Sequence, residues 1–286
     1  MKKLMIAASA ALCATVSFAE LASANIVGYE NKAIDTTKML NAVCSTFNAV
    51  GREAVMGDIT ANSTFLFGGD SVQIINPANG GTLKTMTYLT AEEGAQYNCV
   101  AGWYDYDFVN GNIGEWDWAS QIPAEYSYNN FSLPFGSMFI VSSSYDGAQL
   151  NYAGEVMTES KQFEIDTTKM LNFLGNATPV DRTFADITAN STFLFGGDSI
   201  QILNPANGAT LKTMTYLTAE EGAQYNCAPG WYDYDFVNGN VGEWDWASQI
   251  PDQYCYNNDD CPSGFGFIVS SSYDGAYIEI PGALVD

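Results

Sequence analysis

A stretch rich in tryptophan, tyrosine and carboxylate side chains occurs twice in this chain, at residues 103–118 and 231–246. The first copy reads WYDYDFVNGNIGEWDW, and the second differs from it only in having valine in place of Ile113. Aromatic rings offer flat apolar faces to a ligand, and carboxylates bind cations or act in pairs as acid and base. These residue types are the ones in the chain best suited to binding or catalysis.

The stretch is predicted to form a β-hairpin with a three-residue loop at 110–112. In that register the aromatic side chains at 104, 106, 108, 116 and 118 lie on one face of the hairpin and every carboxylate lies on the other. A two-residue Asn-Gly loop would mix the two kinds on both faces, which is less favourable because one face of a strand pair is normally buried. We therefore expect the three-residue loop.

The acidic face of this hairpin is a candidate calcium site. Like charges directly opposite each other destabilise a strand pair, and calcium takes oxygen ligands from several acidic side chains. The spacing does not match an EF-hand loop, and a solvated acidic face is the simpler interpretation. The candidate ligands are Asp105, Asp107, Glu115 and Asp117 in the first copy and Asp233, Asp235, Glu243 and Asp245 in the second.

The aromatic face also has two interpretations. Alternating aromatic residues are typical of a buried sheet face, and the pattern favours this interpretation. The alternative is a platform on which sugar rings stack, as in a lectin. The candidate ligand-binding residues of such a platform are Trp103, Trp118, Trp231 and Trp246.

The composition limits the chemistry further. The chain has 33 acidic and 10 basic residues, a net charge of −23 and no histidine. The lack of histidine excludes Ser-His-Asp and Cys-His nucleophile systems and removes the commonest transition-metal ligand. Few Lys and Arg residues argue against nucleic acid as a partner, because phosphate contacts depend on them. A glycosidase with two carboxylates remains open, but no carboxylate stands out, so we expect no enzyme activity.

The N-terminus predicts export. Lys2 and Lys3 precede an apolar run at 4–18 and then small residues, which is the pattern of a secretory signal peptide. We expect cleavage after Ala24, with Ala19 as the alternative, so that residues 1–24 are the signal. No other apolar run approaches the ~20 residues of a membrane-spanning helix. The expected location is the periplasm, cell surface or surroundings of a bacterium, without membrane insertion.

Five cysteines follow the signal. An oxidising compartment permits disulfide bridges, although spacing alone cannot rank the possible pairings. The expected pairs are Cys44 with Cys99 and Cys255 with Cys261. Cys227 would then be free or would link two molecules, and an inert buried thiol is an equal alternative for it.

The chain contains a long internal repeat. Residues 58–130 match residues 186–258 at a constant offset of 128, with 64 of 73 positions identical. Upstream, residues 34–40 match 165–171 at an offset of 131. The duplication predicts two tandem, nearly identical domains of one fold, at residues 25–153 and 154–286.

The predicted fold class is all-β, with each domain an antiparallel β-sandwich or barrel-like structure. Short segments rich in Val, Ile, Thr, Tyr and Phe alternate with Gly, Asn and Asp turns, as such folds require. In the first copy we expect one hairpin from 71–75 and 83–89 and another from 138–142 and 148–152. The helix candidates are 37–42 and 90–96.

Four short motifs are spread along the first copy: ANIVGY at 24–29, GWYD at 102–105, PFGSMFIV at 134–141 and YAGEV at 152–156. Together they resemble a family of exported, uncharacterised β-rich proteins from diderm bacteria. The resemblance implies an exported all-β module and brings no activity and no functional residues. The second copy departs from the pattern, because CPSG stands at 261–264.

The sequence as a whole predicts an exported, non-catalytic cell-surface, matrix or adhesive structural protein. Its two domains would self-associate through exposed edge strands. The alternative is a bivalent carbohydrate-binding protein, in which two weak sites gain avidity on a surface polysaccharide. Calcium is the only cofactor that we expect.

Overall fold

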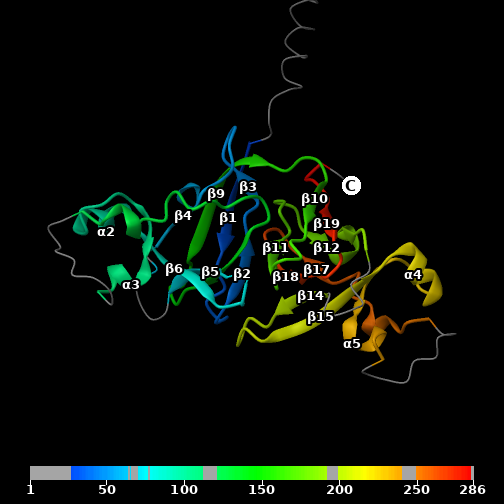
Figure 1. Cartoon of the computed structure of the whole chain (residues 1–286). Coiled ribbons are helices and arrows are strands. Elements are labelled where there is room, and N and C mark those ends of the chain that lie inside the picture. Colours follow the sequence, from blue (N-terminus) through cyan, green and yellow to red (C-terminus); the bar gives the residue numbers. More distant parts are fainter. Residues whose placement is uncertain are drawn as a thin grey trace, which may run out of the picture.

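The computed structural model describes residues 27–63, 65, 70–76, 78–111, 121–191, 199–239 and 249–284. In this part of the chain the protein is β-rich, and all strand pairs are antiparallel. We call residues 27–156 the first half and residues 157–284 the second half. The sheets occupy the middle of the molecule, with short helices at its two opposite ends (Figure 1).

Each half contains one five-stranded sheet, and the strand order is the same in both. In the first half the order is β2 (Asn41–Cys44), β8 (Met138–Ser142), β5 (Ser71–Ile75), β6 (Thr82–Leu89) and β7 (Gly102–Asp105). In the second half it is β11 (Asn172–Gly175), β18 (Gly266–Ser270), β14 (Ser199–Leu203), β15 (Thr210–Leu217) and β16 (Gly230–Asp233).

Smaller sheets complete each half. The first half has β1 (Val27–Ala33), β3 (Phe47–Asn48) and β4 (Thr60–Ala61), all paired with β9 (Gln149–Val156). In the second half β10 (Lys161–Glu164) and β13 (Thr188–Ala189) pair with β19 (Tyr277–Ile280), and β12 (Arg182–Thr183) pairs with β17 (Asp260–Cys261).

The helices are short. The α-helices of the described residues are α2 (Ala91–Gln96), α3 (Tyr106–Val109), α4 (Ala219–Gln224) and α5 (Tyr234–Val237). The 3-10 turns are η1 (Met56–Asp58), η2 (Ala124–Tyr126), η3 (Phe184–Asp186) and η4 (Asp252–Tyr254). None of the helices in the described ranges has both the length and the apolar character needed to cross a membrane.

Two local predictions are confirmed. Strands β5 and β6 form the expected hairpin. Helix α2 occupies the expected segment because Thr90 and Glu93 form a capping box, in which each side chain accepts a hydrogen bond from the other residue's backbone N–H. In both cases the signal lies within a few neighbouring residues.

The second predicted hairpin is wrong. β8 pairs with β2 and β5, whereas β9 pairs with β1, β3 and β4, so the chain passes from one sheet to another between them. The Asp70 carboxylate, just before β5, accepts a hydrogen bond from the Ser144 N–H at 2.6 Å. This contact holds the connection against the start of β5 and separates the paths of β8 and β9.

The predicted helix at 37–42 is also wrong. The Asp35 carboxylate accepts hydrogen bonds from the backbone N–H and the hydroxyl of Thr37, which closes a turn, and β2 follows from Asn41. The predicted domain boundary between residues 153 and 154 falls inside β9, which continues to Val156 and pairs there with Phe47 of β3.

Each half has its own buried core, centred on Trp103 in the first and Trp231 in the second. A further apolar cluster lies at the joint between the halves and includes Cys44, Met138, Ile140 and Ile268. Backbone hydrogen bonds also cross the joint, from Leu40 N–H to the Pro205 carbonyl at 3.0 Å and from Cys44 N–H to the Gly264 carbonyl at 2.9 Å. The halves are therefore joined by buried apolar surface and by direct bonds.

Candidate functional site

Trp103 and Trp231 are fully buried. The Trp103 indole N–H donates to the Ile59 carbonyl at 2.7 Å, and the Trp231 indole N–H donates to the Ile187 carbonyl at 2.6 Å. A ring enclosed by protein offers no face to a sugar, so the sugar-stacking prediction is wrong for these two residues. They belong to the core instead. Trp118 and Trp246 lie outside the described residues.

The predicted hairpin is wrong at residues 106–109, which form α3 instead of continuing the strand. Asp105 is the N-cap of this helix: one carboxylate oxygen accepts from the Phe108 N–H at 2.9 Å, and the other accepts from the Tyr128 hydroxyl at 2.8 Å. Aspartate is a preferred N-cap residue. The strand therefore ends at Asp105, and aromatic and acidic side chains no longer alternate beyond it.

The second half repeats this arrangement. The Asp233 carboxylate accepts from the Phe236 N–H at 2.8 Å and from the Tyr256 hydroxyl at 2.7 Å. Asp107 and Asp235 lie in the first turn of α3 and α5, where a negative charge favours the helix. The described carboxylates of the candidate calcium site thus stabilise a strand-to-helix turn.

Calcium binding at this stretch remains a prediction. The strand pairing that suggested it does not extend over residues 106–109, which are helical. Within the described ranges, no group of three or more His, Cys, Asp or Glu side chains is placed to hold a metal ion. The other candidate ligands, Glu115, Asp117, Glu243 and Asp245, lie outside the described residues.

Both predicted disulfides are wrong. The five cysteines of the described residues are all free thiols. Cys44 lies in the cluster at the joint, whereas Cys99 packs against a separate cluster near α2 and α3. Cys261 is buried in the core of the second half, whereas Cys255 packs against a separate cluster near α4 and α5. The members of each predicted pair therefore belong to different parts of the structure.

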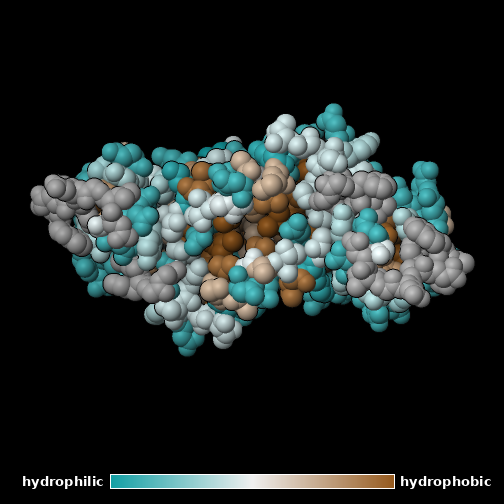
Figure 2. All heavy atoms as spheres, turned by 60° about the horizontal axis from the view of Figure 1, so that its bottom comes forward, coloured by the Kyte–Doolittle hydropathy of each residue, from teal (hydrophilic) through white to brown (hydrophobic). Residues whose placement is uncertain are grey.

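A hollowed apolar surface lies over the joint between the halves. Figure 2 shows hydrophobic residues gathered in the middle of this face. Three adjoining pockets form one groove, because the central pocket, of about 200 Å³, shares lining residues with both neighbours. The shared residues are Leu40, Ile140 and Leu203 on one side and Ile75, Leu171 and Phe173 on the other.

The floor of the groove is built from equivalent positions of the two halves. Leu40 corresponds to Leu171 in the repeat, and Gly80 corresponds to Gly208. A Cβ atom on Gly80 would lie 3.2 Å from the Leu171 Cδ1 atom, and one on Gly208 would lie 2.7 Å from the Leu40 Cδ1 atom. Each leucine therefore fits against the glycine turn of the opposite half, so the groove has approximate two-fold symmetry.

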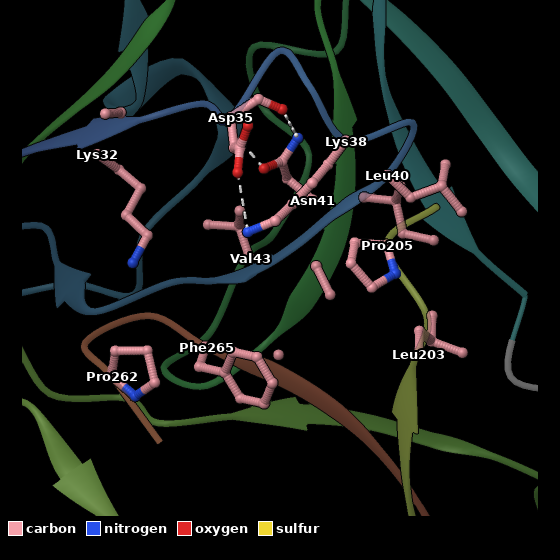
Figure 3. Close-up of a pocket in the computed structure, with 14 residues that line it drawn as sticks. Lys32, Asp35, Lys38, Leu40, Asn41, Val43, Leu203, Pro205, Pro262 and Phe265 are labelled. Atoms are coloured by element: carbon pink, nitrogen blue, oxygen red, sulfur yellow. Dashed lines mark hydrogen bonds and ion pairs between the residues drawn. The ribbon is translucent and has the colours of Figure 1, made fainter. Parts of the chain in front are cut away.

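Charged residues stand at the ends of this groove. At one end Lys32 and the ion pair of Lys38 with Asp35, at 3.0 Å, face Leu203, Pro205 and Phe265 across the pocket (Figure 3). The Lys32 ammonium donates to the Ser263 carbonyl of the other half. At the opposite end Lys169 pairs with Asp166 at 2.8 Å. The site is thus an apolar floor between two internally neutral ion pairs.

Asp35 and Asp166 have depressed pKa values. The pKa of Asp35 is lowered to about 2, first by the hydrogen bond from the Thr37 side chain and then by that from Lys38. The pKa of Asp166 is also lowered to about 2, with Lys169 as the first cause and Thr168 as the second. A depressed pKa stabilises the fold above the ordinary value of 3.8. That contribution is lost as the pH falls toward 2.

We therefore expect both carboxyl groups to titrate near pH 2 in an NMR titration of the folded protein. Thr37→Val removes the first cause at Asp35 and should move its midpoint up toward 3.8. Asp166 in the same sample is the matched control and should not move. A midpoint near 3.8 for Asp35 in the unsubstituted chain would contradict the assignment.

None of three comparisons, with protein families, with curated proteins and with solved structures, found a match for this chain. The resemblance to exported β-rich bacterial proteins therefore remains a prediction.

Sequence reasoning does not predict the groove. The groove has one signal in the sequence, the segment DTTKML, which occurs at 35–40 and again at 166–171. Each copy places an exposed methionine directly before the leucine that enters the groove. Repetition of an exposed apolar residue beside a half-buried one is the pattern that would have indicated a surface between the halves.

Proposed function

We propose that this chain is an exported, non-catalytic structural or adhesive component of a bacterial cell surface or matrix. It consists of two tandem, nearly identical antiparallel β-domains, and it self-associates through the groove over their joint. The repeated strand order supports the two-domain architecture. The observation that carries the proposal is the apolar groove with its exposed apolar rim.

The rim is the first argument for association. Leu83 lines the groove and is 48% exposed, and Met39 and Met170, the residues directly before Leu40 and Leu171, are 56% and 57% exposed. Exposed apolar side chains beside an apolar groove are typical of a site of association. Beside a groove with an apolar floor, these side chains supply the area that a partner would bury.

The symmetry and the charge of this surface favour a second copy as the partner. Equivalent residues of the two halves occur on both sides of the groove, so the patch matches the two-fold symmetry of the commonest homodimers. Two chains of net charge −23 repel each other. The groove adds nothing to this repulsion, because Lys38 and Lys169 neutralise the carboxylates at its ends.

The joint between the halves supports a structural role. The buried cluster and the backbone bonds that cross it make the two halves one unit rather than two modules on a flexible linker. Bivalent carbohydrate binding has less support, because Trp103 and Trp231 are core residues.

Sedimentation velocity of the chain without residues 1–24 tests the proposal. We expect a concentration-dependent shift from monomer to dimer or larger species, strengthened by added salt because salt screens the repulsion. Met39→Glu combined with Met170→Glu places two charges on the rim and should weaken association at least ~tenfold.

The control is Val100→Glu, which changes an even more exposed apolar residue, at 71%, outside the groove. It should associate like the unsubstituted chain. A chain that remains monomeric at all concentrations, or a rim variant that associates as well as the control, would contradict self-association through the groove.

A further inference from the structure

The two halves differ in cysteine content at one place where their structures agree. Cys99 corresponds to Cys227, but Ser127 of the first half corresponds to Cys255 of the second. Among the differences between residues 58–130 and 186–258, this is the one that introduces a thiol. The second half therefore holds two thiols where the first holds a thiol and a hydroxyl.

In the first half these positions face a common space. Cys99 and Ser127 both line a pocket of about 390 Å³, together with Tyr104. The backbone of Tyr104 pairs with that of Ser127 in an isolated β-bridge. The hydroxyl of Tyr104 donates to the carbonyl of Val100, the residue after Cys99, at 2.8 Å. One tyrosine thus contacts both chain segments.

The second half keeps this geometry. The backbone of Tyr232 pairs with that of Cys255, and its hydroxyl donates to the Ala228 carbonyl, directly after Cys227, at 2.8 Å. Both thiols pack against the same buried cluster, which includes Leu217 and Phe236. Among the cysteines of the described ranges, only Cys227 and Cys255 pack against the same apolar cluster.

We propose that Cys227 and Cys255 form a disulfide bridge when the folded protein meets a disulfide oxidant, and that the first half forms no such bridge. The bridge fastens the segment between α4 and β16 to the segment after η4. Cys44 and Cys261 are fully buried and take no part in it.

Electrostatics agrees with this proximity. Burial is the main cause that raises the pKa of Cys227, the hydrogen bond with the Tyr232 side chain lowers it, and the neighbouring Cys255 raises it. A raised pKa lowers the fraction of thiolate, the form that attacks disulfides. Attack by Cys227 is therefore expected to be slower at neutral pH than attack by an ordinary exposed thiol, and faster at higher pH.

The reaction is thiol–disulfide exchange with an organic disulfide. One protein thiolate attacks the reagent, which forms a mixed disulfide and releases one reagent thiol. The second protein thiolate then attacks the protein-bound sulfur and releases the second reagent thiol. The two protein thiols lose two electrons and two protons, and the reagent disulfide gains them. Loss of a proton from each protein thiol supplies the hydrogen of each released thiol.

The experiment equilibrates the folded chain with glutathione disulfide and glutathione, traps the remaining thiols with an alkylating agent, and maps the peptides by mass spectrometry. We expect two thiols fewer per chain and one cross-linked peptide pair containing Cys227 and Cys255. Cys227→Ser and Cys255→Ser should each abolish it. In urea, which unfolds the chain, Cys227 and Cys255 should no longer cross-link in preference to other pairs of cysteines.

The first half supplies a matched gain-of-function variant. Ser127→Cys should create a second cross-link, to Cys99, because it places two thiols in the first half in the geometry that Cys227 and Cys255 have in the second. Mixed disulfides with glutathione on both Cys227 and Cys255, cross-links that include Cys44 or Cys261, or no new cross-link in the Ser127→Cys chain would each overturn the inference. Self-association enters none of these readouts, so the two proposals fail independently.

Discussion

Replacement of Trp103 by alanine is expected to lower the free energy of unfolding by about 3–5 kcal/mol. The indole is fully buried and packs near Tyr88 and Phe65, with ring centroids 5.0 Å and 5.8 Å away. Truncation creates a cavity in the core of the first half. It also leaves the Ile59 carbonyl without the indole N–H as its donor. The measurement is urea unfolding followed by far-ultraviolet circular dichroism.

Trp231→Ala should cost a similar amount, because Trp231 makes the equivalent contacts with Ile187 and, at 5.0 Å between ring centroids, with Tyr216. The control is Tyr145→Ala, which truncates an exposed aromatic residue and should change stability by less than about 0.5 kcal/mol. A loss below about 1 kcal/mol for both tryptophan variants would contradict their place in the cores.

Gly175→Ala is expected to destabilise the joint between the halves by about 1–3 kcal/mol, the cost of overpacking. A Cβ atom at this position would lie 2.4 Å from the Phe265 carbonyl oxygen and 2.6 Å from the Cys44 Sγ atom. The carbonyl belongs to the backbone and cannot turn aside as a side chain does. The loss should appear as a lower melting temperature and as earlier unfolding in urea.

A double-mutant cycle separates the two contacts. Cys44→Gly removes the thiol and its Cβ atom, so Gly175→Ala should cost less in that background, although the Phe265 contact remains. The control is Gly81→Ala, because the equivalent residue of the second half is Ala209. It should be almost neutral. Equal costs of Gly175→Ala in both backgrounds would show that Cys44 does not occupy this space.

Those parts of the fold that depend on neighbouring residues could be predicted from the sequence. The hairpin of β5 and β6 and the helix that begins after Thr90 follow from short turn and capping patterns. The parts that failed depend on distant contacts. Asp70 redirects the chain after β8, and no local pattern reveals that contact.

The candidate site was less predictable than the fold. Asp105 has the residue type of a metal ligand and also that of an N-cap, and the backbone of the following turn decides between the two. The groove is lined by Leu40 and Leu171, which are ordinary hydrophobic residues. Their role follows from the packing of one half on the other, and no periodic pattern of residues in the sequence predicts that packing.

The close approach of Cys44 to Gly175 also bears on how a duplicated chain avoids pairing incorrectly. The two positions align within the strands β2 and β11, so a chance encounter of two first halves would bring two cysteines into space for one. Two second halves would bring two glycines together and leave a hole. At this position a cysteine of one half packs against a glycine of the other, so a first half and a second half fit together. A single diverged pair therefore favours contact between a first half and a second half over contact between two like halves.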